Sequence, residues 1–145
     1  MSPPRHRWPV RIYYEDTDAG GVVFHARYLH FFERARTEFM RALGLEHSRL
    51  LADYGVIFIV RRVDLELAAP ARLDDALEVV TRIDAMTGAR LRVRQEARRD
   101  GRLLAAGDLQ LAVVGSDLRP KRLPAALTDR LAAWVASRAV PAKGA

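Results

Sequence analysis

Three carboxylates, one histidine and a Gly-Gly pair lie in one short segment of the chain, residues 14–25. The carboxylates are Glu15, Asp16 and Asp18, and the histidine is His25. Such groups serve enzymes as nucleophiles and as proton donors or acceptors. The segment also precedes a strong helical pattern, and a helix start adds free N–H donors and a positive dipole end. A plain loop would also be polar and rich in glycine, so residue types alone leave both interpretations open.

The flanking elements follow from the spacing of apolar residues. Alternation over residues 8–14 predicts a strand whose buried face carries Trp8, Val10, Ile12 and Tyr14. After the segment, steps of three and four predict a helix over 28–43 that Gly44 ends. Its apolar stripe is Tyr28, Phe32, Ala35, Phe39 and Leu43, widened by Leu29 and Met40, with Phe31 beyond it. A helix this aromatic is expected to lie against a sheet.

The rest of the chain predicts one more short helix, four strands and a final helix. The short helix covers 46–54 and ends at Gly55, and the strands cover 57–67, 77–83, 90–98 and 103–114. Met86-Thr87-Gly88 indicates a turn, and Asp100-Gly101 is a strong hairpin signal. The final helix starts near Pro124 and has Leu127, Leu131 and Trp134 on its apolar face. This order predicts an α+β fold with one edge of the sheet open to another subunit.

Length and composition indicate a single domain over residues 1–145, with an ordered core over about 8–137 and flexible termini. The absence of cysteine excludes disulfides, thiolate metal sites and cysteine nucleophiles. No apolar run approaches the roughly 20 residues that span a membrane. Residues 1–8 lack the apolar core of a signal peptide, so we expect a cytoplasmic protein.

The formal net charge of +6 is compatible with nucleic acid, an anionic membrane or an anionic small ligand. Apart from its arginines the chain has no nucleic-acid-binding motif, so we expect no nucleic-acid partner. It also lacks metal-ligand spacing and the glycine motifs of nucleotide sites, and we expect neither a metal nor a cofactor.

A long motif resembles a known family of enzymes. It consists of Tyr13-Tyr14-Glu15-Asp16-Thr17-Asp18-Ala19-Gly20-Gly21-Val22-Val23-Phe24-His25, then Ala26-Arg27-Tyr28-Leu29 and Phe32-Glu33-Arg34-Ala35-Arg36. It resembles the hotdog-fold acyl-CoA thioesterases, most closely the Tol-Pal-associated (YbgC-like) family within the 4-hydroxybenzoyl-CoA thioesterase group. The resemblance implies a five-stranded antiparallel sheet wrapped around one long helix, and a homodimer or homotetramer with sites between subunits. Phe24 and Arg27 depart from the tyrosine and asparagine that are usual there.

The resemblance implies hydrolysis of acyl-CoA to a free carboxylic acid and CoA. Asp18 falls on the catalytic aspartate, as nucleophile or as general base, although an Asx-turn or a helix cap would also explain an aspartate here. Asp16 is the competing carboxylate and is expected to be structural. His25 would orient the substrate or assist proton transfer, or would simply be a hydrogen-bonded histidine at a helix start.

Further residues of the motif would line the substrate site. Gly20 and Gly21 permit close approach of a ligand to the backbone, and N–H groups around residues 23–25 would polarise the thioester carbonyl. The expected substrate-binding residues are Tyr14, Gly21, Val23 and Phe24, with Arg62 as a contact to the CoA phosphates. The rival interpretation is a non-catalytic module that binds acyl carrier protein or is associated with the envelope, for which Asp18 would have no purpose.

Overall fold

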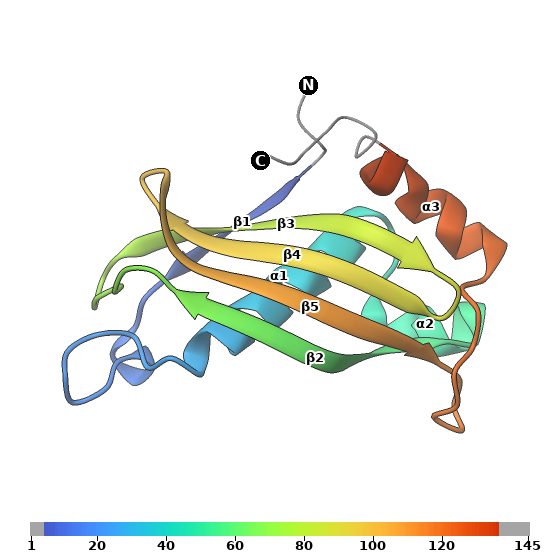
Figure 1. Cartoon of the computed structure of the whole chain (residues 1–145), viewed down its shortest axis with the longest axis horizontal. Coiled ribbons are helices and arrows are strands. Elements are labelled where there is room, and N and C mark those ends of the chain that lie inside the picture. Colours follow the sequence, from blue (N-terminus) through green and yellow to red (C-terminus); the bar gives the residue numbers. More distant parts are fainter. Residues whose placement is uncertain (1–4, 137–145) are drawn as a thin grey trace.

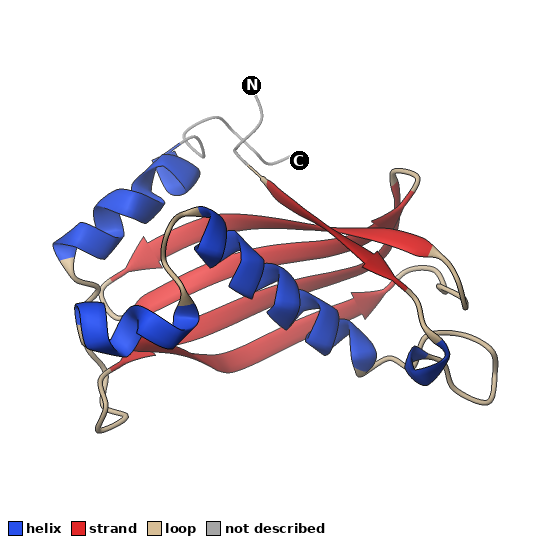
Figure 2. Cartoon of the chain, turned by 180° about the vertical axis from the view of Figure 1, so that it is seen from behind, coloured by secondary structure: helices blue, strands red, loops and turns tan. Residues whose placement is uncertain are grey.

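The computed structural model of the chain describes residues 5–136. Its elements are β1 (His6–Arg11), a 3-10 turn η1 (Tyr14–Asp16), α1 (Arg27–Ala42), α2 (His47–Tyr54), β2 (Ile57–Leu67), β3 (Ala76–Thr87), β4 (Arg90–Arg99), β5 (Arg102–Val114) and α3 (Ala125–Ala136). The five strands form one antiparallel sheet in the order β1-β3-β4-β5-β2. The sheet curves around α1, which lies across its inner face (Figures 1 and 2), so the predicted α+β architecture is confirmed. The predicted core limit at residue 137 and the tail beyond it lie outside the described residues.

The aromatic side of α1 is buried, as its periodicity predicts. Phe32, Ala35, Phe39 and Met40 are at most 4% exposed. Phe31 was expected beyond this stripe, and that expectation is wrong, because its side chain is fully buried. It belongs to a cluster that also contains Ile12, Leu77 and Val79. The curled sheet and β1 therefore cover a wider sector of the helix than one stripe.

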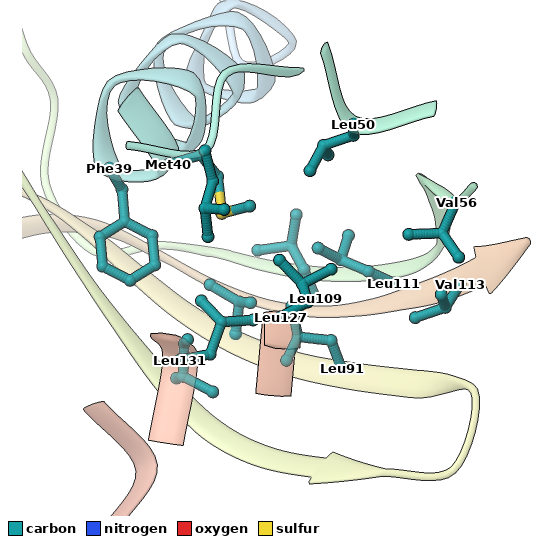
Figure 3. Close-up of a cluster of buried hydrophobic side chains, with 13 residues drawn as sticks. Phe39, Met40, Leu50, Val56, Leu91, Leu109, Leu111, Val113, Leu127 and Leu131 are labelled. Atoms are coloured by element: carbon teal, nitrogen blue, oxygen red, sulfur yellow. The ribbon is translucent and has the colours of Figure 1, made fainter. Parts of the chain in front are cut away.

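A second cluster lies at the carboxyl end of α1 (Figure 3). Phe39 and Met40 point from the helix toward Leu91 and Leu111 of the sheet. The cluster also takes in Leu50 of α2, Val56 and Val113, and Leu127 and Leu131 of α3. The predicted apolar face of α3 is thus confirmed for its two leucines, while the side chain of Trp134 is outside the described part. The three helices share one core on the inner face of the sheet.

Two predicted strand ends are wrong for identifiable reasons. Strand β1 ends at Arg11, and Tyr14 lies in η1 with 82% of its surface exposed. Strand β3 continues past Ile83 to Thr87, because a register shift between Ile83 and Ala85 interrupts the alternation without ending the strand. Such irregularities insert a residue into one strand, so the period of two is lost locally.

The predicted turn residues occupy the conformations that favour them. Gly44 and Gly55 have φ of +77° and +73° directly after α1 and α2. Asp100 and Gly101 have φ of +50° and +80° between β4 and β5, as a type I′ hairpin requires.

Strand β2 is an edge strand with an irregularity of its own. It pairs with β5 along one side, with a register shift between Val60 and Arg62. Phe58 and Val60 before the shift, and Val63 after it, line hollows on the α1 side of the sheet. The shift therefore keeps apolar side chains inward on both halves and turns Arg62 to the outer face.

Gly107 of β5 lies against the ring of Phe32 of α1. A Cβ atom there would lie 2.9 Å from Cε2 of Phe32, whose ring is fully buried. The helix can pack this close to the strand only because residue 107 has no side chain.

We expect Gly107→Ala to lower the free energy of unfolding by about 1–3 kcal/mol, because the added methyl group overpacks the core against Phe32. Urea titration followed by circular dichroism measures the change. In a double-mutant cycle Phe32→Leu should relieve part of the cost. Strict additivity of the two changes would contradict the assigned contact.

Candidate active site

The segment before α1, which includes η1, is built around a buried carboxylate. Asp16 is 4% exposed, and its Oδ2 accepts a hydrogen bond of 2.8 Å from the N–H of Tyr13. Its Oδ1 accepts two from Arg27, 2.9 Å from Nε and 2.6 Å from Nη2. Glu15 adds a longer ion pair of 3.5 Å to the same guanidinium. Arg27, the departure from the usual asparagine, thus ties the first turn of α1 to the segment before it.

Backbone bonds hold the segment against the chain that follows β2. Val23 donates its N–H to the carbonyl of Ala71 at 2.8 Å, and Val22 forms a bridge with Arg72. Phe24 donates to the carbonyl of Asp16 at 2.9 Å. The segment therefore closes on itself beside the carboxyl end of β2, where Figures 1 and 2 both show it.

Asp18 lies on the exposed part of this segment. Its Oδ1 accepts a hydrogen bond of 2.8 Å from the N–H of Gly20, an Asx-type turn. Its N–H donates to the carbonyl of Val22, and its carbonyl accepts from Gly21, both at 2.9 Å. Gly21 has a φ of +81°, which a residue with a side chain rarely adopts. Asp18 therefore both shapes its turn and presents a carboxylate to solvent.

The start of α1 offers hydrogen-bond donors at His25 and Ala26, seven and eight residues after Asp18 in the chain. Among the described residues, neither His25 nor Ala26 has an acceptor for its N–H, whereas the N–H groups of Val23 and Phe24 are used within the segment. The rings of Phe24 and His25 are exposed and in contact, with centroids 4.5 Å apart. This distribution leaves two N–H groups at the positive end of the helix dipole free to bind a ligand.

The remaining predicted site residues lie in three different environments. Val23 is 5% exposed and packs in the core, and Tyr14 is exposed on η1. Arg62 lines a polar hollow on the outer face of the sheet with Asp64, Asp84, Arg92, Asp108 and Gln110. Asp18, Gly21, Phe24 and His25 thus lie in the same short segment, and Arg62 lies on a different face.

A groove runs along α1 on its β2 side, and we call it the α1 groove. Its outer part, about 240 Å³, is lined by Leu29, His30, Glu33, Arg36, Val60, Val63 and Leu109. Its inner part, about 200 Å³, is lined by Glu33, Arg36, Phe39, Met40, His47, Phe58, Val60, Thr81, Leu91, Val93 and Leu111. The two parts share Glu33, Arg36 and Val60, so they adjoin, the outer one at the first turn of the helix and the inner one toward α2.

Sequence reasoning missed the polar residues of the α1 groove. Arg36 donates from Nη1 to Oε1 of the buried Gln95 at 2.9 Å, and burial lowers the pKa of its guanidinium. Burial and the nearby Arg36 lower the pKa of His47, whose Nδ1 lies 3.3 Å from Oγ1 of Thr37. The sequence did contain a signal that the Arg36 side chain faces the sheet, because Arg36 stands four residues after Phe32 and three before Phe39, within the apolar stripe.

The described part of the chain contains no group of three or more His, Asp or Glu side chains placed to hold a metal ion. None of its helices is both long and apolar enough to cross a membrane.

Comparison with known proteins agrees with this architecture. A family model described as the thioesterase-like superfamily matches residues 13–135. The chain belongs to the thioesterase-like superfamily. The match covers the candidate site and all the elements that position it, from η1 to nearly the end of α3.

Relatives within this thioesterase-like superfamily are similar over most of their length. The acyl-CoA thioester hydrolase YbgC of Escherichia coli O6:H1 is 44% identical over 126 residues, which cover 86% of this chain and 93% of that protein. The acyl-CoA thioesterase YbgC of Haemophilus influenzae is 42% identical over 118 residues, covering 81% and 87%. The crystal structure of a probable thioesterase from Bartonella henselae superposes with a TM-score of 0.80 at 35% identity, covering 83% and 100%.

The Asp16–Arg27 pair generates a stability prediction. Arg27→Met leaves the buried Asp16 carboxylate without its cation, and we expect the free energy of unfolding to fall by about 3–5 kcal/mol. Urea titration of the purified protein gives the value.

The matched control is Arg49→Met, which removes an exposed pair with Asp53 at 2.9 Å. Its cost should stay within about 0.5 kcal/mol, as for other exposed helical pairs. Equal losses in the two variants would show that Asp16 does not depend on Arg27.

Proposed function

We propose that this member of the thioesterase-like superfamily hydrolyses acyl-CoA thioesters to free carboxylic acids and CoA, with Asp18 as its catalytic carboxylate. The observation that carries the proposal is the arrangement of residues 18–26. One short segment carries an exposed carboxylate and, further along, a helix start with two free N–H groups, in a chain 44% identical to an acyl-CoA thioester hydrolase. The buried Asp16 and the exposed Glu15 both pair with Arg27, so Asp18 is the carboxylate of the segment that remains for chemistry.

The reaction needs an attacking oxygen and a stabilised carbonyl oxygen. The Asp18 carboxylate attacks the carbonyl carbon directly, or it takes a proton from a water molecule that attacks. In either case the C–S bond breaks, CoA leaves as the thiolate and takes up a proton, and water supplies the second oxygen of the acid. The N–H groups of His25 and Ala26 would bind the developing oxyanion, helped by the dipole of α1.

We further propose that two copies pair through the free edge of β2. This edge belongs to a strand of 11 residues without proline, and Ile59 and Leu67 are 38% and 53% exposed on it. The opposite edge, β1, is shorter and contains Pro9, which suits an unpaired edge. Because residues 71–72 after β2 bind the Asp18 segment, a partner along β2 would lie beside the site.

Several finer assignments remain predictions of the same proposal. They are Arg62 and Tyr14 as contacts to CoA, assembly of dimers into a tetramer, recognition of acyl carrier protein, and a cytoplasmic location. A substrate panel that includes acyl-CoA and acyl carrier protein thioesters would separate the catalytic proposal from a purely binding module.

We expect Asp18→Asn to lower kcat/KM for acyl-CoA hydrolysis by about 10²–10⁴-fold, the usual range for loss of a group that transfers a proton in the transition state. Release of free thiol from acyl-CoAs of different lengths measures it. Asparagine keeps the Oδ1 acceptor for Gly20 and removes only the charge, so the turn is preserved.

Glu15→Gln is the control, since it neutralises an exposed carboxylate of the same segment. It should keep nearly full activity. Full activity of Asp18→Asn would overturn the assignment of Asp18, and absence of thiol release by the wild-type protein from every acyl-CoA would overturn the proposed function.

The β2 edge generates a prediction about assembly. Ile59→Lys combined with Leu67→Lys should convert a dimer or larger assembly into a monomer of 16.3 kDa, because charged side chains block edge pairing. Light scattering after size exclusion measures the mass. Leu118→Lys, at a residue 64% exposed outside the strands, should leave the assembly intact. A wild-type protein that is monomeric at micromolar concentration would contradict the pairing.

A further inference from the structure

The α1 groove is a path along the helix that begins next to the candidate site. Its outer part includes Leu29 and His30 in the first turn of α1, directly after His25. With a rise of about 1.5 Å per residue, Arg36 lies roughly 10 Å and Met40 roughly 16 Å along the axis from Leu29. An acyl group whose carbonyl lies at the start of α1 would therefore extend along the groove past Arg36.

The walls of the inner part are mostly apolar. Phe39 and Met40 line it from α1, and Leu91 and Leu111 line it from the sheet. Figure 3 shows these side chains pointing toward one another. Such walls suit a hydrocarbon chain, which gains stability by leaving water.

Arg36 is the exception in this apolar environment. A guanidinium has five N–H donors, and the described structure gives Arg36 one acceptor, Oε1 of Gln95. Glu33 acts on it at longer range, and no carboxylate among the described residues lies within ion-pair distance. Arg36 is partly buried and lines both parts of the α1 groove, so its remaining N–H donors are available to an acceptor that enters the groove.

Gln95 fixes the direction of that cation. Its Nε2 donates to the carbonyl of Phe32 and to Oγ1 of Thr81, each at 2.9 Å, so its Oε1 is turned toward Arg36. Gln95 is fully buried, and it therefore anchors the guanidinium at the groove. His47 of α2 also lines the inner part, and burial and the nearby Arg36 lower its pKa.

We propose that the α1 groove binds the acyl group of the substrate and that Arg36 selects acyl chains carrying an oxygen acceptor, a carboxylate or a hydroxyl, at their far end. This inference rests on the proposed function, because the thioester must lie at Asp18 for the chain to enter the groove. Arg36 acts as a specificity-determining residue and takes no part in breaking the C–S bond.

The test compares acyl-CoAs of matched length, from short to long, that end in a methyl group, a hydroxyl or a carboxylate. At the chain length that reaches Arg36, we expect the wild-type kcat/KM to favour an oxygen-bearing end over methyl by about tenfold or more, as for a hydrogen bond to a charged group. A preference for carboxylate over hydroxyl would identify an anionic acyl end. Arg36→Met should abolish the preference.

Two further variants, and the ratio of kcat/KM between chain ends within each protein sample, serve as controls. Arg34→Met removes an exposed arginine of the same helix and should leave the preference unchanged. Arg36→Lys keeps the charge but not the planar fork, and should keep part of the preference. The ratio between chain ends is measured within one protein sample, so partial unfolding of Arg36→Met does not distort it.

The outcomes separate the two proposals. Hydrolysis of methyl-ended chains with no preference for oxygen at any length, or an unchanged preference in Arg36→Met, would overturn the role of Arg36 and leave the thioesterase proposal standing. Failure to release thiol from every acyl-CoA would overturn both.

Discussion

Burial of the aromatic side of α1 against the curved sheet is the interaction on which the rest of the structure depends. Phe31, Phe32 and Ala35 are fully buried, and Gly107 lets β5 approach the Phe32 ring. Each large apolar side chain buried in this way contributes about 1.5–3 kcal/mol. Because the helix is held along its length, its first turn stays beside the candidate site and its last turn stays against α2.

Asp16 and Asp18, two carboxylates of the segment before α1, differ in burial and in pairing. Asp16 is buried, and its oxygens accept bonds from Tyr13 and Arg27, so its charge is compensated. Asp18 is exposed, and its carboxylate accepts a single hydrogen bond, from the N–H of Gly20. Fixing Asp16 orders the turn that carries Asp18, and the proposed role of Asp18 requires such preorganisation.

The basic composition of the chain is not gathered into one patch. On β4, Arg94 pairs with Asp108 at 3.0 Å and with Glu96 at 3.2 Å, and Arg98 pairs with Glu96 at 2.8 Å. Burial raises the pKa of Glu96, but its bonds to these two arginines outweigh burial and hold that pKa below its usual range. The charges of these arginines are thus compensated by nearby carboxylates.

The sequence by itself determined the element types, several exact boundaries and the family, because periodicity, turn residues and the motif over residues 13–36 are local signals. It predicted β2 over 57–67 and the positions of Gly44 and Gly55 correctly. Only the tertiary structure decided the burial of Phe31, the exposure of Tyr14 and the engagement of the Val23 and Phe24 N–H groups. It also decided that Arg36 meets Gln95, 59 positions away in the sequence, at the wall of a groove. Each of these depends on contacts between segments far apart in the chain, and a periodicity within one segment carries no information about its neighbours in space.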